Sequence, residues 1–132
     1  MSTGRYRTDL ARARGLGASK TGAGHWLQER ITSILLVPLS VWAVFAGFRL
    51  ASVDYATAVA WLQQPFNAVM LILLVAISFI HMHAGMRVIV EDYIHKTLSK
   101  SVLLVINLMV CLLAGSLAVL SILKVALGGG IF

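Results

Sequence analysis

Charged side chains are scarce in this sequence. Only 12% of the 132 residues are Asp, Glu, Lys or Arg, whereas 59% are hydrophobic, and the mean hydropathy is +0.89. Soluble domains usually carry about a quarter charged residues, because their surfaces must face water. The composition therefore excludes a soluble globular domain, a disordered chain and a nucleic-acid-binding module. It indicates a membrane protein.

Cysteine is nearly absent as well. Cys111 is the single cysteine of the chain, so the sequence allows no internal disulfide and no cysteine-ligated metal site or iron–sulfur cluster. No flavin-binding motif is present either. Without a flavin or cluster site, the chain is not expected to be a redox catalyst on its own. Its length corresponds to one small domain, residues 1–132.

The chain contains three long runs without a charged residue: Ile31–Phe48, Pro65–Met86 and Ser101–Leu123. A helix needs about 20 residues to cross a hydrocarbon layer of about 30 Å. With their flanking residues, the runs predict three transmembrane helices over about residues 30–50, 65–93 and 100–125. Pro38 predicts a local kink in the first helix. The predicted fold class is an all-α membrane protein with three spans.

Basic residues predict how these spans are oriented. Eleven Lys and Arg stand against five Asp and Glu. Nine of the Lys and Arg residues fall on the same side of a three-span protein: Arg5, Arg7, Arg12, Arg14, Lys20, Arg30, Arg87, Lys96 and Lys100. The other side has only Arg49 and Lys124. The positive-inside bias therefore predicts a cytoplasmic N-terminus, with residues 1–29 as a cytoplasmic segment, and a C-terminus outside.

Polar residues inside the spans are the first candidates for function. His81 lies about 15 residues into the second span, and on a helix it shares a line with Gly85, Val88 and Asp92 to within about 40°. His83 points nearly the opposite way, so the two histidines are not expected to form a joint metal site. Gly85 leaves room beside His81 for a flat ligand such as haem, but it equally suits close helix packing. From spacing alone, a hydrogen bond between helices is the favoured interpretation of His81, and haem ligation is the alternative. His83 is expected either to snorkel or to form a hydrogen bond between helices.

The cytoplasmic ends of the first two spans hold a second group of candidates. Asp92 and Tyr93 lie about 16–18 Å along the helix from His81. Tyr93 either anchors the helix in an aromatic belt or donates a hydrogen bond to a quinone carbonyl. Trp26 suits the same belt. Arg30 either snorkels to water or neutralises an anion, such as a haem propionate or a polarised quinone oxygen.

Together, these features resemble the hydrophobic membrane anchor subunit of succinate dehydrogenase (succinate:quinone oxidoreductase, complex II). The resemblance covers nearly the whole chain, from the basic N-terminus through the three spans. The stretch Gly24-His25-Trp26 to Arg30 is similar to the sequence that leads into the family's first helix. Most specific is the motif His-x-x-x-Gly followed by Asp-Tyr, whose positions are filled here by His81, Gly85, Asp92 and Tyr93.

The resemblance implies partners and roles. The family's anchor subunit packs with a second three-helix subunit, the cytochrome b chain, and one haem b lies between the two. A flavoprotein subunit oxidises succinate, and an iron–sulfur subunit passes the electrons to ubiquinone. The match implies His81 as one axial ligand of the haem iron, with the other ligand on the partner chain. It implies Tyr93 as a hydrogen-bond donor to ubiquinone, Asp92 as its support and Arg30 near the haem propionates or the quinone pocket. The implied location is the bacterial inner membrane, as a multi-pass protein.

Three alternatives stay open. An anchor of a related fumarate reductase differs in the direction of the reaction, which this chain's sequence barely separates. A small transport subunit with a proton path through His81 and Asp92 is disfavoured, because Asp92 lies at the membrane boundary and no repeat or broken helix is present. An assembly subunit without haem would use its histidines only to join helices.

Overall fold

The computed structural model describes residues 8–15 and 22–128, and this part of the chain is helical. It contains five helices: α1 (Asp9–Ala13), α2 (Gly22–Leu50), α3 (Tyr55–Leu62), α4 (Pro65–Tyr93) and α5 (Thr97–Ala126). Three of them, α2, α4 and α5, are long and apolar enough to cross a membrane. The predicted all-α class with three spans is thereby confirmed.

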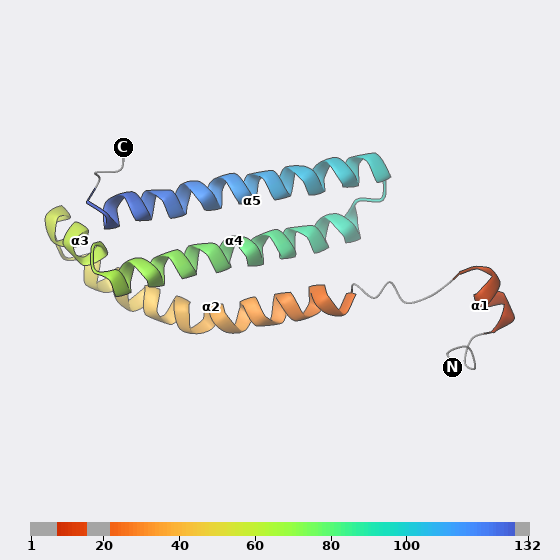
Figure 1. Ribbon diagram of the computed structural model, residues 1–132, viewed down its shortest axis with the longest axis horizontal. Coiled ribbons are helices and arrows are strands. Elements are labelled where there is room, and N and C mark those ends of the chain that lie inside the picture. The colour runs from red at the N-terminus through yellow and green to blue at the C-terminus, as the bar shows by residue number, and fades with distance from the viewer. Residues whose placement is uncertain (1–7, 16–21, 129–132) are drawn as a thin grey trace.

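The three long helices form a flat antiparallel bundle in which α4 lies between α2 and α5 (Figure 1). Pro65 occupies the start of α4, where its missing N–H costs nothing. The helix α2 begins at Gly22, ahead of the span predicted over about residues 30–50, so its first two turns consist of the polar stretch that precedes the apolar run. Parts of the predicted segment 1–29, residues 1–7 and 16–21, lie outside the described residues. The helix α2 continues through Pro38, and its ribbon curves along its length (Figure 1).

The short helix α3 lies in a segment for which the sequence predicts no helix. Its Trp61 ring stacks on Trp42 of α2, with centroids 5.9 Å apart and an angle of 20° between the planes. The Nδ2 atom of Asn67 donates to the Trp61 carbonyl over 2.8 Å, and Nε2 of Gln63 donates to the Val125 carbonyl of α5 over 3.5 Å. These contacts hold α3 against one end of the bundle. Eight residues are too few to show a helical period in the sequence.

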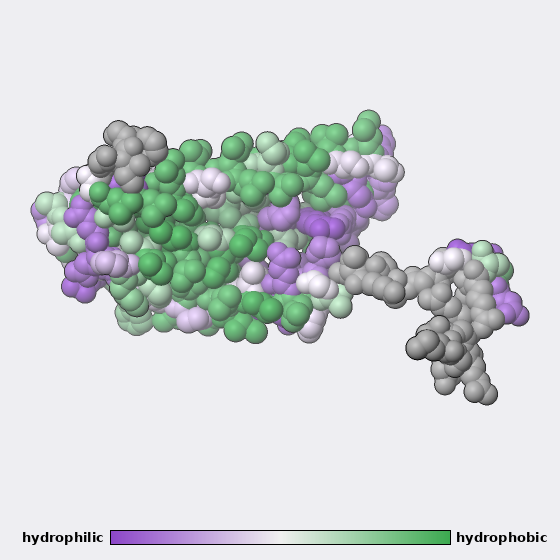
Figure 2. Space-filling view, in the orientation of Figure 1, coloured by the Kyte–Doolittle hydropathy of each residue, from purple (hydrophilic) through white to green (hydrophobic). Residues whose placement is uncertain are grey.

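The bundle has little interior of its own. In the described part of the chain, the buried apolar residues are Leu39, Ala68, Val90 and Cys111. Many large apolar side chains are exposed instead, such as Phe45 at 71% and Phe48 at 76%. Figure 2 shows this as a hydrophobic band between two more hydrophilic ends. Such a surface is stable only when lipid or another apolar subunit covers it.

The helices α4 and α5 pack closely where Phe79 meets Gly115. A Cβ atom added at Gly115 would lie 3.3 Å from Cγ of Phe79, whereas one added at Gly47 of α2 meets no atom within 4 Å. We expect Gly115→Val to destabilise the packing of α4 on α5 by about 1–3 kcal/mol, because the added methyl groups force the Phe79 ring away. Thermal unfolding of the purified protein in detergent measures this loss. Gly47→Val is the control, and an equal loss in both variants would contradict the assignment to Phe79.

Candidate functional site

Four polar side chains lie at a common depth inside the apolar bundle. Thr32 is ten residues from the start of α2, Asn107 is ten residues from the start of α5, and His81 is twelve residues before the end of α4. At about 1.5 Å per residue, these positions are about 15–18 Å from the end of the bundle that holds Tyr93. His83, ten residues before the end of α4, lies at the same depth as Thr32 and Asn107. We refer to Thr32, His81, His83 and Asn107 as the polar layer.

His81 is hydrogen-bonded to α2 through one ring nitrogen. Its Nδ1 lies 2.9 Å from Oγ1 of Thr32, and Thr32 is only 7% exposed. The same hydroxyl oxygen lies 2.9 Å from the carbonyl oxygen of Gln28 and 3.1 Å from that of Glu29. Within the described part of the chain, no hydrogen bond engages Nε2 of His81. The hydrogen bond between helices that was favoured for His81 is present, and it uses only half of the imidazole's capacity.

Gly85 lies one turn beyond His81 on the same face of α4. A Cβ atom placed on it would meet nothing within 4 Å. The close helix packing proposed as one reason for this glycine is therefore not made by any described helix of this chain. The room beside His81 is open.

His83 faces the other neighbouring helix. Its Nδ1 lies 3.0 Å from Nδ2 of Asn107 on α5, and the same amide nitrogen donates to the His83 carbonyl over 3.1 Å. Sγ of Cys111 donates to Oδ1 of Asn107 over 3.5 Å. The hydrogen bond between helices expected of His83 is confirmed. The prediction that the two histidines point in different directions is also confirmed, since His81 faces α2 and His83 faces α5.

No three His, Cys, Asp or Glu side chains lie close enough together to hold a metal ion in residues 8–15 and 22–128. The imidazoles of His81 and His83 are the side chains of the polar layer that could serve as metal ligands, since each leaves Nε2 without a hydrogen bond in the described residues.

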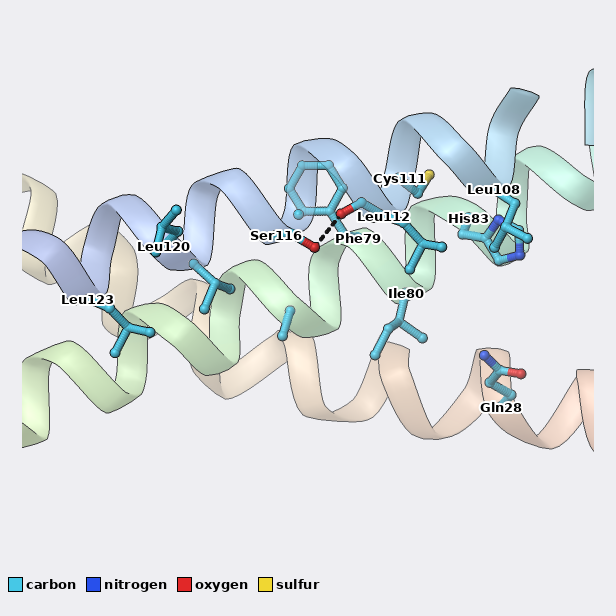
Figure 3. Close-up of a pocket in the computed structure, with 13 residues that line it drawn as sticks. Gln28, Phe79, Ile80, His83, Leu108, Cys111, Leu112, Ser116, Leu120 and Leu123 are labelled. Atoms are coloured by element: carbon cyan, nitrogen blue, oxygen red, sulfur yellow. Dashed lines mark hydrogen bonds between the residues drawn. The ribbon is translucent and has the colours of Figure 1, made fainter. Parts of the chain in front are cut away.

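A cavity of about 600 Å³ lies along α4 and α5, and Gln28 of α2 borders it. Figure 3 shows His83 and Gln28 at one end and Leu120 and Leu123 at the other. The lining between these ends is mostly apolar, with Phe79 from α4 and a series of residues from α5. The sequence did not predict this cavity. Its chemistry suits hydrocarbon more than a polar ligand.

The remaining predicted residues lie at the end of the bundle where α2 begins and α4 ends. Arg30 is exposed, and its guanidinium lies 5.3 Å from the centroid of the Trp26 ring, a cation–π contact. Asp92 and Tyr93 form the last turn of α4, and Tyr93 is 76% exposed. Arg30 makes no hydrogen bond or ion pair with Asp92 or Tyr93 in the described structure. The three predicted side chains are therefore available to a partner rather than joined to one another.

Contacts around Glu91 hold this end of the bundle together. Nε of Arg87 forms an ion pair with the Glu91 carboxylate at 2.7 Å, and Nζ of Lys100 on α5 donates to the Glu91 carbonyl over 2.9 Å. An exposed ion pair adds little stability, so the main consequence is positional: the last turn of α4 is fixed beside the first turns of α5.

Thr32 is the hydrogen-bond partner of His81 that the sequence did not reveal. The available signal was a hydroxyl side chain inside an apolar run, two positions after Arg30. Pairing it with His81 requires the relative depth of both residues and the rotation of α2 against α4, which the sequence of one span does not give.

The fold and the polar layer define a small multi-pass membrane protein that holds two histidines inside its spans and exposes most of its apolar surface. Residues 4–120 match the family of succinate dehydrogenase/fumarate reductase transmembrane subunits. The chain belongs to this family, which confirms the resemblance noted in its sequence.

Individual relatives agree. The chain is 34% identical over 108 residues to the succinate dehydrogenase hydrophobic membrane anchor subunit of Rickettsia conorii, covering 81% of this chain and 86% of that protein. It is 36% identical over 95 residues to the subunit of that description in Rickettsia felis, covering 72% and 79%. For the subunit of Paracoccus denitrificans the identity is 26% over 89 residues, covering 67% and 69%.

Proposed function

We propose that this chain is the hydrophobic membrane anchor subunit of a succinate:ubiquinone oxidoreductase of the bacterial inner membrane. The family match and the names of its relatives support this role. The chain is not catalytic alone. It works with a flavoprotein subunit, an iron–sulfur subunit and a cytochrome b membrane subunit. Its N-terminus is cytoplasmic and its C-terminus lies outside, as the excess of basic residues on one side of the spans favours.

The exposed apolar faces support a second membrane subunit. The bundle is one layer of three helices (Figure 1), and its outward apolar side chains include Val37, Val44 and Leu112 at 56–64% exposure. A second three-helix subunit packed on one face leaves the opposite face to lipid. Small residues and side chains able to hydrogen-bond then determine the contact, since lipid and apolar side chains are equally apolar.

The single observation that carries the cofactor proposal is how the imidazole of His81 is placed and hydrogen-bonded. Its imidazole lies at depth, Nδ1 is hydrogen-bonded to the buried Thr32, and Nε2 has no hydrogen bond within the described residues. The space beside Gly85 is open. These residues fit a b-type haem: His81 would bind its iron through Nε2, and Arg30 would lie near the propionates or the quinone pocket. A haem bound there supplies a one-electron carrier near the quinone site.

Tyr93 and Asp92 form this chain's part of the quinone site. The Tyr93 hydroxyl donates a hydrogen bond to a ubiquinone carbonyl, which stabilises the negative charge that develops on that oxygen during reduction. Asp92 supports this donor from the neighbouring position. The exposure of both side chains fits a pocket whose remaining walls come from partner subunits.

Purification through an affinity tag on this chain tests the role. We expect detergent-solubilised complex to oxidise succinate with an artificial dye and to reduce ubiquinone. Faster reduction of fumarate by quinol than oxidation of succinate would indicate the fumarate reductase alternative instead. A tagged chain that retains neither activity contradicts the proposal, provided that the same tag on a succinate-oxidising subunit recovers both.

A further inference from the structure

We propose that Thr32 and Asn107 set opposite tautomers of the two histidines, and that this difference selects His81 over His83 as the iron ligand. The inference rests on the proposed function, because it concerns how the chain prepares its haem ligand. Thr32 and Asn107 are positioning residues, since each acts through the imidazole to which it is hydrogen-bonded.

The Thr32 hydroxyl has one hydrogen and three neighbours. Two of them, the carbonyl oxygens of Gln28 and Glu29 at 2.9 and 3.1 Å, can only accept. If the hydroxyl hydrogen pointed at Nδ1 of His81, both oxygen–oxygen contacts would set lone pair against lone pair. Donation back to the preceding turn of its own helix is the usual geometry of a threonine within a helix. The hydroxyl oxygen therefore accepts from His81, and Nδ1 carries the hydrogen.

The consequence for His81 follows from the chemistry of neutral imidazole. When Nδ1 is protonated, Nε2 holds a lone pair. This is the tautomer that binds iron through Nε2, and histidine ligands usually donate their other N–H to an acceptor that fixes the ring. Here, the acceptor is a buried hydroxyl 2.9 Å away, which also fixes the rotation of the imidazole.

The Asn107 amide imposes the opposite choice on His83. The His83 carbonyl, 3.1 Å from Nδ2, only accepts, and the Cys111 thiol donates to Oδ1. These two contacts orient the amide. The second hydrogen of Nδ2 then points to Nδ1 of His83, 3.0 Å away. His83 Nδ1 accepts, so the hydrogen of the neutral ring is on Nε2, which leaves no lone pair there for iron.

Selection is needed because both imidazoles lie at nearly the same depth and leave Nε2 without a hydrogen bond in the described residues. They are two residues apart on α4, at nearly the same depth, and both are partly exposed. Sequence spacing favours His81 only through its relation to Gly85 and Tyr93. The two hydrogen bonds supply an independent chemical reason, and they come from residues on different helices.

The assembled complex provides the test, through its haem content and the midpoint potential of its haem. Thr32→Val keeps the shape of the side chain and removes the acceptor. We expect haem retention to fall about 10- to 100-fold, as for lost outer-shell partners of metal ligands. We also expect the midpoint potential to shift to a more positive value, because an imidazole without an acceptor at Nδ1 stabilises ferric iron less. Thr32→Ser restores the hydroxyl and should return both values to those of the wild type.

Two control variants separate this role from a structural one. Ser33→Ala removes a neighbouring hydroxyl that donates only to the Glu29 carbonyl. Asn107→Leu removes the hydrogen bond of the other histidine in the polar layer. We expect neither to shift the potential, although Asn107→Leu lowers thermal stability. Should Thr32→Val fail to assemble, Thr32→Ala gives the same comparison with a smaller side chain.

An unshifted potential in Thr32→Val, or an equal shift in Asn107→Leu, overturns the inference. If His81→Ala removes the haem spectrum while Thr32→Val leaves the potential unchanged, haem ligation stands and only the tautomer assignment fails. If His81→Ala leaves the spectrum intact, the proposed haem function fails and this inference fails with it.

Discussion

Replacing His81 with alanine is expected to abolish the b-type α-band of the purified complex, whereas His83→Ala should leave that band in place. Both histidines leave Nε2 free of hydrogen bonds in the described structure, but His81 has open space beside Gly85 and, in the tautomer proposed above, a lone pair on Nε2. The amide of Asn107 donates to Nδ1 of His83, which places the hydrogen of that ring on Nε2. The measurement is a reduced-minus-oxidised visible spectrum at matched protein concentration.

The two variants control for each other. Each removes one imidazole from α4 and one hydrogen bond between helices, and such bonds contribute about 0.6 kcal/mol on average in membrane proteins. A difference between their spectra therefore reports ligation rather than general loss of packing. Loss of the band in His83→Ala alone would move the ligand to His83, and an unchanged band in both variants would exclude this chain as a haem ligand.

The sequence predicted three membrane-spanning helices correctly because its few charged residues lie at the ends of the apolar runs. The helix α4 runs from Pro65 to Tyr93 and contains the second apolar run. The helix α2 extends beyond the first apolar run, since hydropathy reports the apolar layer rather than the whole helix. The short α3 was missed because its stability comes from the stacking of Trp61 on Trp42 and from contacts with α5, which are tertiary.

The candidate site was only partly predictable. The angular relation of His81, His83 and Gly85 is a property of one helix, so the sequence shows it directly. The pairing of His81 with Thr32 and of His83 with Asn107 depends on how α2 and α5 rotate against α4. No pattern within a single span encodes that rotation. The positions of Arg30 and Tyr93 relative to a quinone depend further on subunits that this chain does not contain.

Replacing Tyr93 with phenylalanine is expected to slow quinone reduction about 10- to 100-fold while leaving dye-linked oxidation of succinate unchanged. The phenol hydroxyl is the only group removed, and a hydrogen bond to a charged oxygen contributes about 1.5–3 kcal/mol. Tyr93 is the last residue of α4, and its side chain is 76% exposed. Removing its hydroxyl therefore leaves no buried hydrogen-bonding group of this chain without a partner. Both rates are measured on the same purified complex.

Tyr55→Phe is the matched control for this experiment. Tyr55 is 84% exposed and begins α3 at the opposite end of the bundle, so its hydroxyl can anchor the chain at an interface but cannot reach the same quinone. We expect it to change neither rate. If Tyr93→Phe also leaves quinone reduction unchanged, Tyr93 is an interfacial anchor like Tyr55. If the dye-linked rate falls in parallel, the hydroxyl acts on assembly of the complex, because electrons reach the dye without passing through the quinone site.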